Sequence, residues 1–142
     1  MITRDEILMG RDKEYPLNAT LESNLQKLLT ALNKFRTIYG KPMQVSSGYR
    51  PGKYNKAAGG ATKSNHMICM ACDFVDIDSS LDSFCVANQD VLKECGLYLE
   101  HPKWTNTWCH LDILPRKRRI FIPTDKEPTK EKLDDLFSDL RV

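Results

Sequence analysis

A short apolar segment with one carboxylate inside it limits this fold more than any other feature of the chain. In residues 70–77 apolar side chains occupy both alternating faces, with Ala71, Val75 and Ile77 on one face and Cys72 and Phe74 on the other. Apolar residues on both faces predict a buried strand. Asp73 lies inside this strand, where an isolated carboxylate costs several kcal/mol unless it is paired or bound to a metal. The fold must therefore supply a partner for Asp73.

Two amphipathic helices are predicted on either side of this strand in the sequence. Apolar residues recur at helical spacing through residues 21–38, with Asn18 or Thr20 as the N-cap and Gly40 as the stop. A second helix is predicted from residue 79 or 80 to a stop at Gly96. The spacing of their apolar residues indicates that each helix packs one face against the core.

Further strands are predicted at residues 43–46, 97–100 and 108–113, with 120–122 as a candidate for one more. Several connections are too short for a crossover helix, which favours antiparallel pairing. The predicted fold is α+β, a small and mostly antiparallel sheet packed against two or three helices. Residues 1–142 are expected to form one domain, in which 123–142 is an exposed tail with a short helix at 130–140.

The composition excludes several classes of protein. No apolar run approaches the roughly twenty residues of a membrane span. The charged N-terminus shows no secretory signal, so we expect synthesis in a bacterial or host cytoplasm and export only with help. The five cysteines are an odd number in a chain that needs no disulfides, which favours reduced thiols. A soluble monomer is expected.

A basic run at residues 116–119 reads Arg-Lys-Arg-Arg in a chain whose net charge is only +2. Such a run is typical of a solvated turn, and contact with an anionic wall polymer or a nucleic acid is the alternative. No aromatic residue interleaves the run, which disfavours nucleic-acid binding.

Two histidines are placed to join Asp73. His110 shares one face of the 108–113 strand with Trp108 and Asp112, while the other face is apolar. His66 ends a small, polar and glycine-containing loop at 57–65, just before the Asp73 strand. Two imidazoles and a carboxylate with a fourth position open form a catalytic zinc environment. Each histidine taken alone is more typical of a hydrogen-bonded surface or core residue, and an Asp–His pair without metal is common.

Three ordered motifs carry a resemblance to a known family. The sequence resembles the zinc D-alanyl-D-alanine carboxypeptidase family, which also contains L-alanyl-D-glutamate endopeptidases and phage lysins. The family patterns S-G-Y-R, S-x-H-(six residues)-D and W-x-H are matched here by Ser47-Gly48-Tyr49-Arg50, by Ser64-Asn65-His66 through Asp73, and by Trp108-Cys109-His110. Residues 6–11 and 96–102 also resemble a subgroup of small peptidase-like proteins carried by bacteriophages and bacteria.

The resemblance implies that His66, Asp73 and His110 hold Zn²⁺ and that Arg50 grips a substrate carboxylate. The planar fork of donors on arginine matches a carboxylate, which agrees with the last assignment. Ser64, Tyr49 and Trp108 are further candidates for binding substrate, without a role in the chemistry. The implied substrate is bacterial peptidoglycan.

A zinc peptidase also needs a general base, and Glu100 is the prediction. Similar proteins place an acid before the W-x-H strand, and in many of them it lies three positions before the final histidine. That position is Thr107 here. Asp112 and His101 remain alternatives as the base, and Asp112 also suits a role in orienting His110.

A second departure from the family pattern is Cys69, where relatives commonly have glycine. It creates a CxxC with Cys72, which is read as structural thiols, as metal ligands with His66, or as a redox couple.

The sequence therefore predicts a zinc peptidase that hydrolyses amide bonds in peptidoglycan stem peptides, as a carboxypeptidase or an endopeptidase. It is expected to act at the cell wall or in the periplasm, as a phage lysin or a virion-associated enzyme. The alternative is a noncatalytic wall-binding or phage structural module that keeps the fold.

Overall fold

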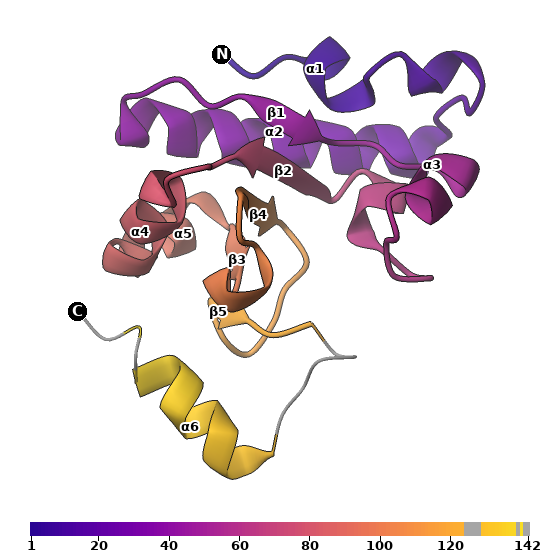
Figure 1. Cartoon of the computed structure of the whole chain (residues 1–142). Helices are drawn as coiled ribbons and strands as arrows, with labels where there is room; N and C mark the ends of the chain where they lie inside the picture. Colours follow the sequence, from indigo (N-terminus) through magenta and orange to yellow (C-terminus); the bar gives the residue numbers. More distant parts are fainter. Residues whose placement is uncertain (124–128, 139, 141–142) are drawn as a thin grey trace.

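A five-stranded sheet forms the centre of the protein (Figure 1). The computed structural model describes residues 1–123, 129–138 and 140. In spatial order the strands are β1 (Val45–Ser47), β2 (Ala71–Val75), β4 (Trp108–Asp112), β3 (Tyr98–Glu100) and β5 (Ile120–Phe121). All neighbouring pairs are antiparallel except β3 and β5, which are parallel. The predicted α+β fold is confirmed, with a mixed sheet.

The long helix α2 (Ala19–Tyr39) covers one face of the sheet. Its ends are those that the sequence predicts: the Asn18 side chain accepts a hydrogen bond from the Leu21 N–H at 2.8 Å, and Gly40 ends the helix in the left-handed conformation at φ 76°. Its buried residues join the core side of the sheet; they are Leu25, Leu28, Ala31, Leu32 and Phe35.

A short N-terminal helix, α1 (Arg4–Leu8), precedes α2 and was not predicted. The side chain of Thr3 accepts from the Glu6 N–H, and the Glu6 carboxylate accepts from the Thr3 N–H. This reciprocal cap was the local signal for the helix. The short 3₁₀ helix η1 (Arg11–Lys13) follows it.

The alternation of side chains along the strands gives the sheet two different faces. On the α2 side lie fully buried apolar residues from three strands, namely Cys72, Phe74, Leu99, Cys109 and Leu111. Asp73 and His110 alternate with them and therefore point to the opposite face. The prediction that both faces of 70–77 are buried is wrong at its end, since Val75 is 39% exposed and Ile77 73%. The strand ends at Val75, and the chain then leaves the sheet.

The predicted helix at 79–96 is two helices, α4 (Ser80–Ala87) and α5 (Gln89–Cys95), which meet at Asn88. Asn88 has φ −130° and ψ 51°, which breaks the helical path, and its side chain donates to the Phe84 carbonyl at 2.9 Å. The side chain of Asn is able to bond to nearby backbone in this way, which competes with helix continuation. Gly96 ends α5 as predicted.

The connection between β1 and β2 is more ordered than the predicted turn and loop. It contains α3 (Gly52–Ala57) and the short 3₁₀ helix η2 (Asn65–Ile68). Another 3₁₀ helix, η3 (Pro102–Trp104), lies between β3 and β4. The first strand begins two residues later than the predicted 43–46.

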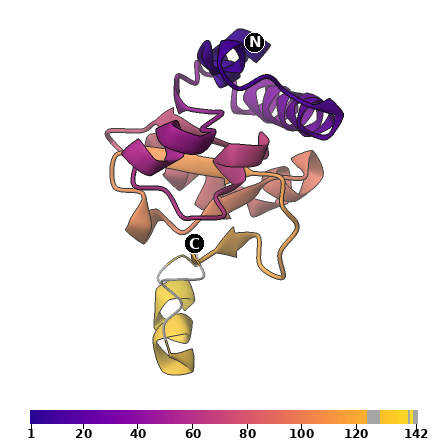
Figure 2. The same ribbon diagram turned by 90° about the vertical axis from the view of Figure 1, so that its right-hand side faces the viewer.

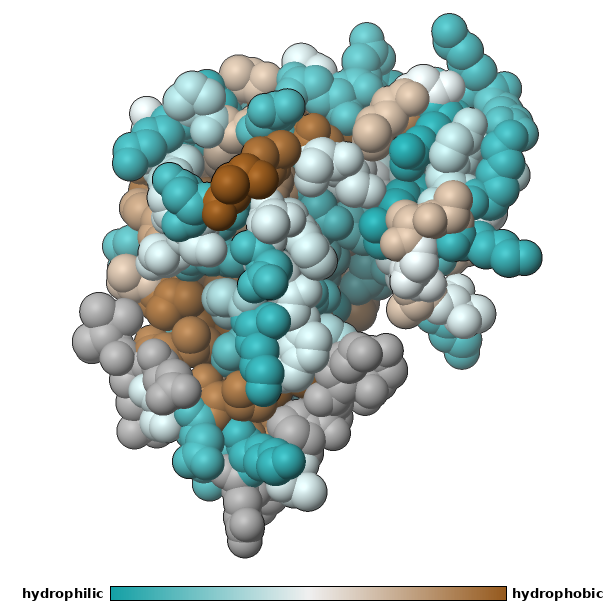
Figure 3. Space-filling model, in the orientation of Figure 1, coloured by the Kyte–Doolittle hydropathy of each residue, from teal (hydrophilic) through white to brown (hydrophobic). Residues whose placement is uncertain are grey.

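The C-terminal helix α6 (Lys130–Ser138) projects from the body on the side opposite α1 and α2 (Figure 2). It touches the body near its C-terminal end, where Phe137 lies edge-on to His101 with ring centroids 5.6 Å apart. In Figure 3, apolar residues gather where this helix meets the body. Among the described residues, no helix is long and apolar enough to cross a membrane.

Candidate active site

Strand pairing brings the predicted metal ligands together. Asp73 in β2 is the direct cross-strand neighbour of His110 in β4, and His110 Nδ1 lies 2.8 Å from Asp73 Oδ1. His66 enters from η2, with its Nε2 3.3 Å from the same oxygen. One ligand atom of each residue lies within 4.8 Å of the other two. All three side chains are buried, at 2%, 7% and 9% exposure for His66, Asp73 and His110.

The backbone fixes the ring of His66. Its Nδ1 donates to the Gly48 carbonyl at 2.9 Å, which leaves a lone pair on Nε2 facing Asp73. This buried Nε2 makes no hydrogen bond of good geometry within the described part of the chain. Burial lowers the pKa of His66, which keeps the ring in the neutral form that binds metals. A metal ion would satisfy this nitrogen.

His110 is held between two carboxylates. Its Nδ1 faces Asp73, and its Nε2 lies 2.8 Å from Asp112 Oδ2. Burial alone would lower the pKa of His110, but the hydrogen bonds to Asp112 and Asp73 outweigh burial and raise it to about 10. The same contacts hold the pKa of Asp73 well below its ordinary value against the effect of burial.

The donor set fits Zn²⁺. Two imidazole nitrogens and one carboxylate oxygen are a ligand set of catalytic zinc sites. His66 Nε2 lacks a hydrogen bond in the described chain, and the contact of His110 Nε2 with Asp112 leaves Nδ1 directed at the same point. A carboxylate behind a ligating histidine is also the usual support of such a site.

A cleft of about 660 Å³ opens over these residues. Arg50, Ser64, Glu100 and Trp108, which the sequence singled out, line it. Ala58, Ala61 and Lys63 line it from the predicted 57–65 loop, whereas no pattern in the sequence indicated that Arg116, Phe121 and Ile122 lie here. The small, polar residues at 57–65 were the local sequence feature that indicated this side of the cleft.

Arg50 points its guanidinium at the metal group. Its Nη1 lies 4.0 Å from Asp73 Oδ2, and its Nη2 lies 3.5 Å from Ser64 Oγ. The Arg50 N–H donates to the His66 carbonyl at 2.9 Å, which ties the Arg50 turn to η2. Burial lowers the pKa of Arg50, and Asp73 opposes that effect. The group remains a cation, since even a lowered arginine pKa stays far above neutral.

Tyr49 is the predicted substrate-binding residue that the structure does not bring to the cleft. Its ring is buried in the core, and its hydroxyl donates to the Tyr15 carbonyl at 3.1 Å. Tyr49 and Arg50 are adjacent in the sequence, and their side chains point to opposite sides of the chain. The structure gives it a packing role.

The three candidates for the general base lie in different surroundings. The antiparallel register, which pairs Tyr98 with Asp112 and Leu99 with Leu111, continues to place Glu100 beside His110. Burial raises the pKa of Glu100. Asp112 is fully buried behind His110 and accepts hydrogen bonds there. Both ring nitrogens of His101 are occupied by backbone groups, at 3.1 Å each, and His101 does not itself line the cleft.

Cys69 adopts the left-handed conformation at φ 59° where it ends η2. Glycine adopts this conformation without strain, which explains why it is common at this position in relatives. Burial raises the pKa of Cys69 to about 12 and that of Cys72 well above its ordinary value. The redox interpretation required a low thiol pKa and is therefore wrong. Neither thiol belongs to the metal-capable group found among the described residues.

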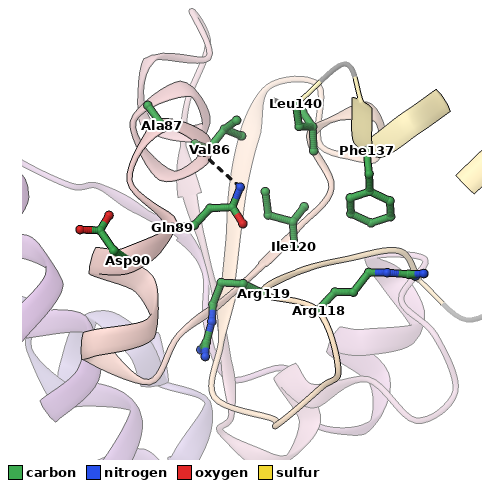
Figure 4. Close-up of a pocket in the computed structure, with 9 residues that line it drawn as sticks. All are labelled: Val86, Ala87, Gln89, Asp90, Arg118, Arg119, Ile120, Phe137 and Leu140. Atoms are coloured by element: carbon green, nitrogen blue, oxygen red, sulfur yellow. Dashed lines mark hydrogen bonds between the residues drawn. The ribbon is translucent and has the colours of Figure 1, made fainter. Parts of the chain in front are cut away.

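The basic run at 116–119 was predicted to be a solvated turn; Lys117 and Arg118 are exposed in agreement with this, whereas Arg116 and Arg119 are partly buried. The guanidinium of Arg116 contacts Asp112 and stacks over Phe121, that of Arg118 lies 4.9 Å from the Phe137 ring centroid, and that of Arg119 donates to the Leu97 carbonyl at 2.9 Å. Arg118 and Arg119 line a second pocket, of about 640 Å³, between α4, β5 and α6 (Figure 4).

A comparison with protein families decides the relationship. A family model described as peptidase M15 matches residues 2–112, which include all three members of the metal-capable group. The chain belongs to the peptidase M15 family. M15 peptidases are zinc-dependent enzymes of peptidoglycan, so the family expected from the three motifs is confirmed. No curated protein and no solved structure matches this M15 peptidase.

Proposed function

We propose that this M15 peptidase hydrolyses an amide bond in the stem peptides of peptidoglycan, with His66, Asp73 and His110 as its zinc ligands. The observation that supports this most is the direct pairing of Asp73 with His110 across β2 and β4, with His66 Nε2 3.3 Å from the same carboxylate oxygen. This arrangement forms at the floor of a cleft large enough for a peptide segment.

Bound zinc supplies a Lewis acid that polarises a carbonyl and acidifies water. Glu100 takes the proton from the attacking water, since it lines the cleft beside His110 and its pKa is raised toward the working pH. The same carboxyl then donates the proton to the leaving amine. Asp112 holds the ring of His110 through Nε2, so that Nδ1 stays directed at the metal position.

Arg50 binds a substrate carboxylate, and Ser64 supports its guanidinium. Trp108 forms part of the cleft wall and excludes water. A carboxypeptidase substrate carries a terminal carboxylate, and a D-glutamyl endopeptidase substrate carries a free carboxylate beside the scissile bond. Both present the group that Arg50 recognises. Mass spectrometry of digested muropeptides distinguishes them, because the first releases a single amino acid and the second separates the stem near its sugar end.

The test is release of amino groups from purified peptidoglycan. The wild-type protein should release them, a chelator should stop the reaction, and added zinc should restore it. His66→Ala and Asp73→Ala should each abolish both zinc binding and release while the protein stays folded. Asp90→Ala serves as the matched control, since this exposed carboxylate does not line the cleft. Full activity in either ligand variant would refute the assignment.

A second candidate is a noncatalytic wall-binding or virion structural module. Thr107 favours it, because many relatives carry the acid at this position and Thr107 is exposed at the start of β4. Such a module would bind peptidoglycan and release no amino groups. The proposed enzyme would act at the cell wall or in the periplasm after synthesis in the cytoplasm, as a lysin or on a virion.

A further inference from the structure

Two side chains, those of His110 and Arg116, bind the carboxylate of Asp112. His110 Nε2 lies 2.8 Å from its Oδ2, and the Arg116 guanidinium contacts both of its oxygens, with Nη2 3.1 Å from Oδ2. The Leu114 N–H also donates to Oδ1 at 3.2 Å. Asp112 is fully buried, so the positive charge of Arg116 compensates a carboxylate that water does not reach. The two-point contact fixes the plane of the carboxylate.

The same guanidinium also holds a second neighbour of His110. The central carbon of the Arg116 guanidinium lies 3.4 Å from the ring centroid of Phe121. The Phe121 ring in turn meets the His110 ring edge-on, with centroids 5.8 Å apart and an interplanar angle of 77°. Arg116, Asp112, His110 and Phe121 therefore form a closed circuit of contacts, in which both groups that Arg116 touches also touch the His110 ring.

We propose that Arg116 is a positioning residue that holds His110 in its metal-binding orientation through Asp112 and Phe121; this inference rests on the proposed function. With Asp112 clamped, His110 donates through Nε2 and presents Nδ1 beside Asp73. Without Arg116, Oδ1 of Asp112 keeps only the Leu114 N–H and the carboxylate loses its compensating charge, so that it turns or admits water. The His110 ring then samples orientations in which Nδ1 leaves the metal position.

The inference predicts a loss of zinc affinity. Supporting groups of this kind contribute about 10- to 100-fold to metal affinity. In the full-length protein, Arg116→Gln should weaken zinc binding by about this factor, measured by competition with a chromophoric chelator. Arg116→Lys keeps the charge but lacks the planar fork, and should lie between Arg116→Gln and the wild type. Lys117→Gln removes the neighbouring exposed charge and should stay within about twofold of the wild type.

A spectroscopic readout separates positioning from general destabilisation. In the zinc-loaded wild type, the Nε2 proton of His110 should give a downfield NMR signal that exchanges slowly with water. Exchange should be faster in Arg116→Gln and less so in Arg116→Lys. If both Arg116 variants bind zinc within about twofold of the wild type and keep the signal, the inference is overturned. If the wild type itself binds no zinc, the proposed function is overturned first.

Discussion

Glu100 sits in surroundings that suit a base more than a structural carboxylate. Burial raises its pKa; the nearby His110 opposes this, whereas Asp73 and Asp112 add to it. A carboxylate with a pKa nearer to neutral accepts a proton from water more readily. Many relatives carry an acid where this chain has Thr107, and here Glu100 from the neighbouring strand β3 brings a carboxylate to the cleft instead.

Glu100→Gln should lower kcat by about 10²- to 10⁴-fold, the usual contribution of a general base. Zinc affinity should change little, because Glu100 does not belong to the metal-capable group. The measurement is amino-group release with zinc content determined on the same sample. Glu94→Gln, on the exposed side of α5, is the matched control. Unchanged kcat in Glu100→Gln would assign the base elsewhere.

Asp82 is a second carboxyl with an unusual pKa, on the core side of the sheet. Burial raises its pKa to about 7, and its Oδ2 accepts from the Thr105 hydroxyl at 3.2 Å. An ordinary Asp titrates at about 3.9, so between about pH 4 and pH 7 the folded protein holds a proton that the unfolded chain has released. The free energy of unfolding therefore falls as the pH rises through this window.

Asp82→Asn should remove this pH dependence. At pH 8 the variant should be more stable than the wild type by up to about 4 kcal/mol, because the wild type must ionise a buried carboxyl there and each of the roughly three pKa units corresponds to about 1.4 kcal/mol. At pH 4 the two should be nearly equal. Urea unfolding at both pH values provides the measurement, with the exposed Asp90→Asn as control. A variant less stable than the wild type at pH 8 would contradict the assignment.

At the scale of elements, α4 begins without a cap from its own N-cap residue. Ser79 adopts the left-handed conformation at φ 61° and makes no side-chain cap. Asp76 takes over this role from the end of β2: its Oδ1 accepts from the Leu81 N–H and its Oδ2 from the Asp82 N–H, each at 2.8 Å. The carboxylate satisfies two backbone donors at once and joins the helix to the sheet.

Asp76→Ala should lower the free energy of unfolding by about 2 kcal/mol, since a charged cap with two hydrogen bonds is lost at a buried position. Asp90→Ala removes an exposed acid from the first turn of α5 and should cost less than about 0.5 kcal/mol. Urea unfolding of the two variants compares them directly. Equal losses of unfolding free energy in the two variants would show that Asp76 does not cap α4.

At the scale of the whole molecule, zinc should stabilise a protein that already folds without it. Asp73, His110 and Asp112 satisfy one another by hydrogen bonds, so the metal-free site keeps its shape. Zinc at 100 times its Kd should then add about 2.7 kcal/mol. Calorimetry with zinc and with chelator should show this difference as a rise in Tm. His110→Ala should abolish the rise, and an unfolded chelator-treated protein would contradict the prediction.

The sequence predicted those features that depend on local patterns. Alternation within two strands was enough to place Asp73 and His110 on one face, and Asn18 and Gly40 marked the ends of α2 by their own chemistry. The role of Arg116 was out of reach, because it lies between β4 and β5 in a segment that is neither helix nor strand, where no periodic pattern indicates that it contacts Asp112 and Phe121. Tyr49 was misplaced because its partner Tyr15 is distant in the sequence.

The two-helix break at Asn88 was missed because neither glycine nor proline marks it. The short helices that flank the 57–65 loop, α3 and η2, were missed because the small polar residues there show no helical pattern. In both places the side-chain bonds of asparagine decide the backbone, as when Asn55 donates to the Ala61 carbonyl at 2.9 Å. Local side-chain contacts of this kind carry no periodic signal.

The pairing of Asp73 with His110 restricts the insertions and deletions that the sequence of this enzyme tolerates during evolution. One residue gained or lost within β2 would send Phe74 into the cleft and Asp73 into the core, because successive side chains point to opposite faces. Insertions and deletions among related sequences should therefore be confined to the loop at 57–63 and to the turns. The spacing inside β2 should stay constant even where the residues themselves are replaced.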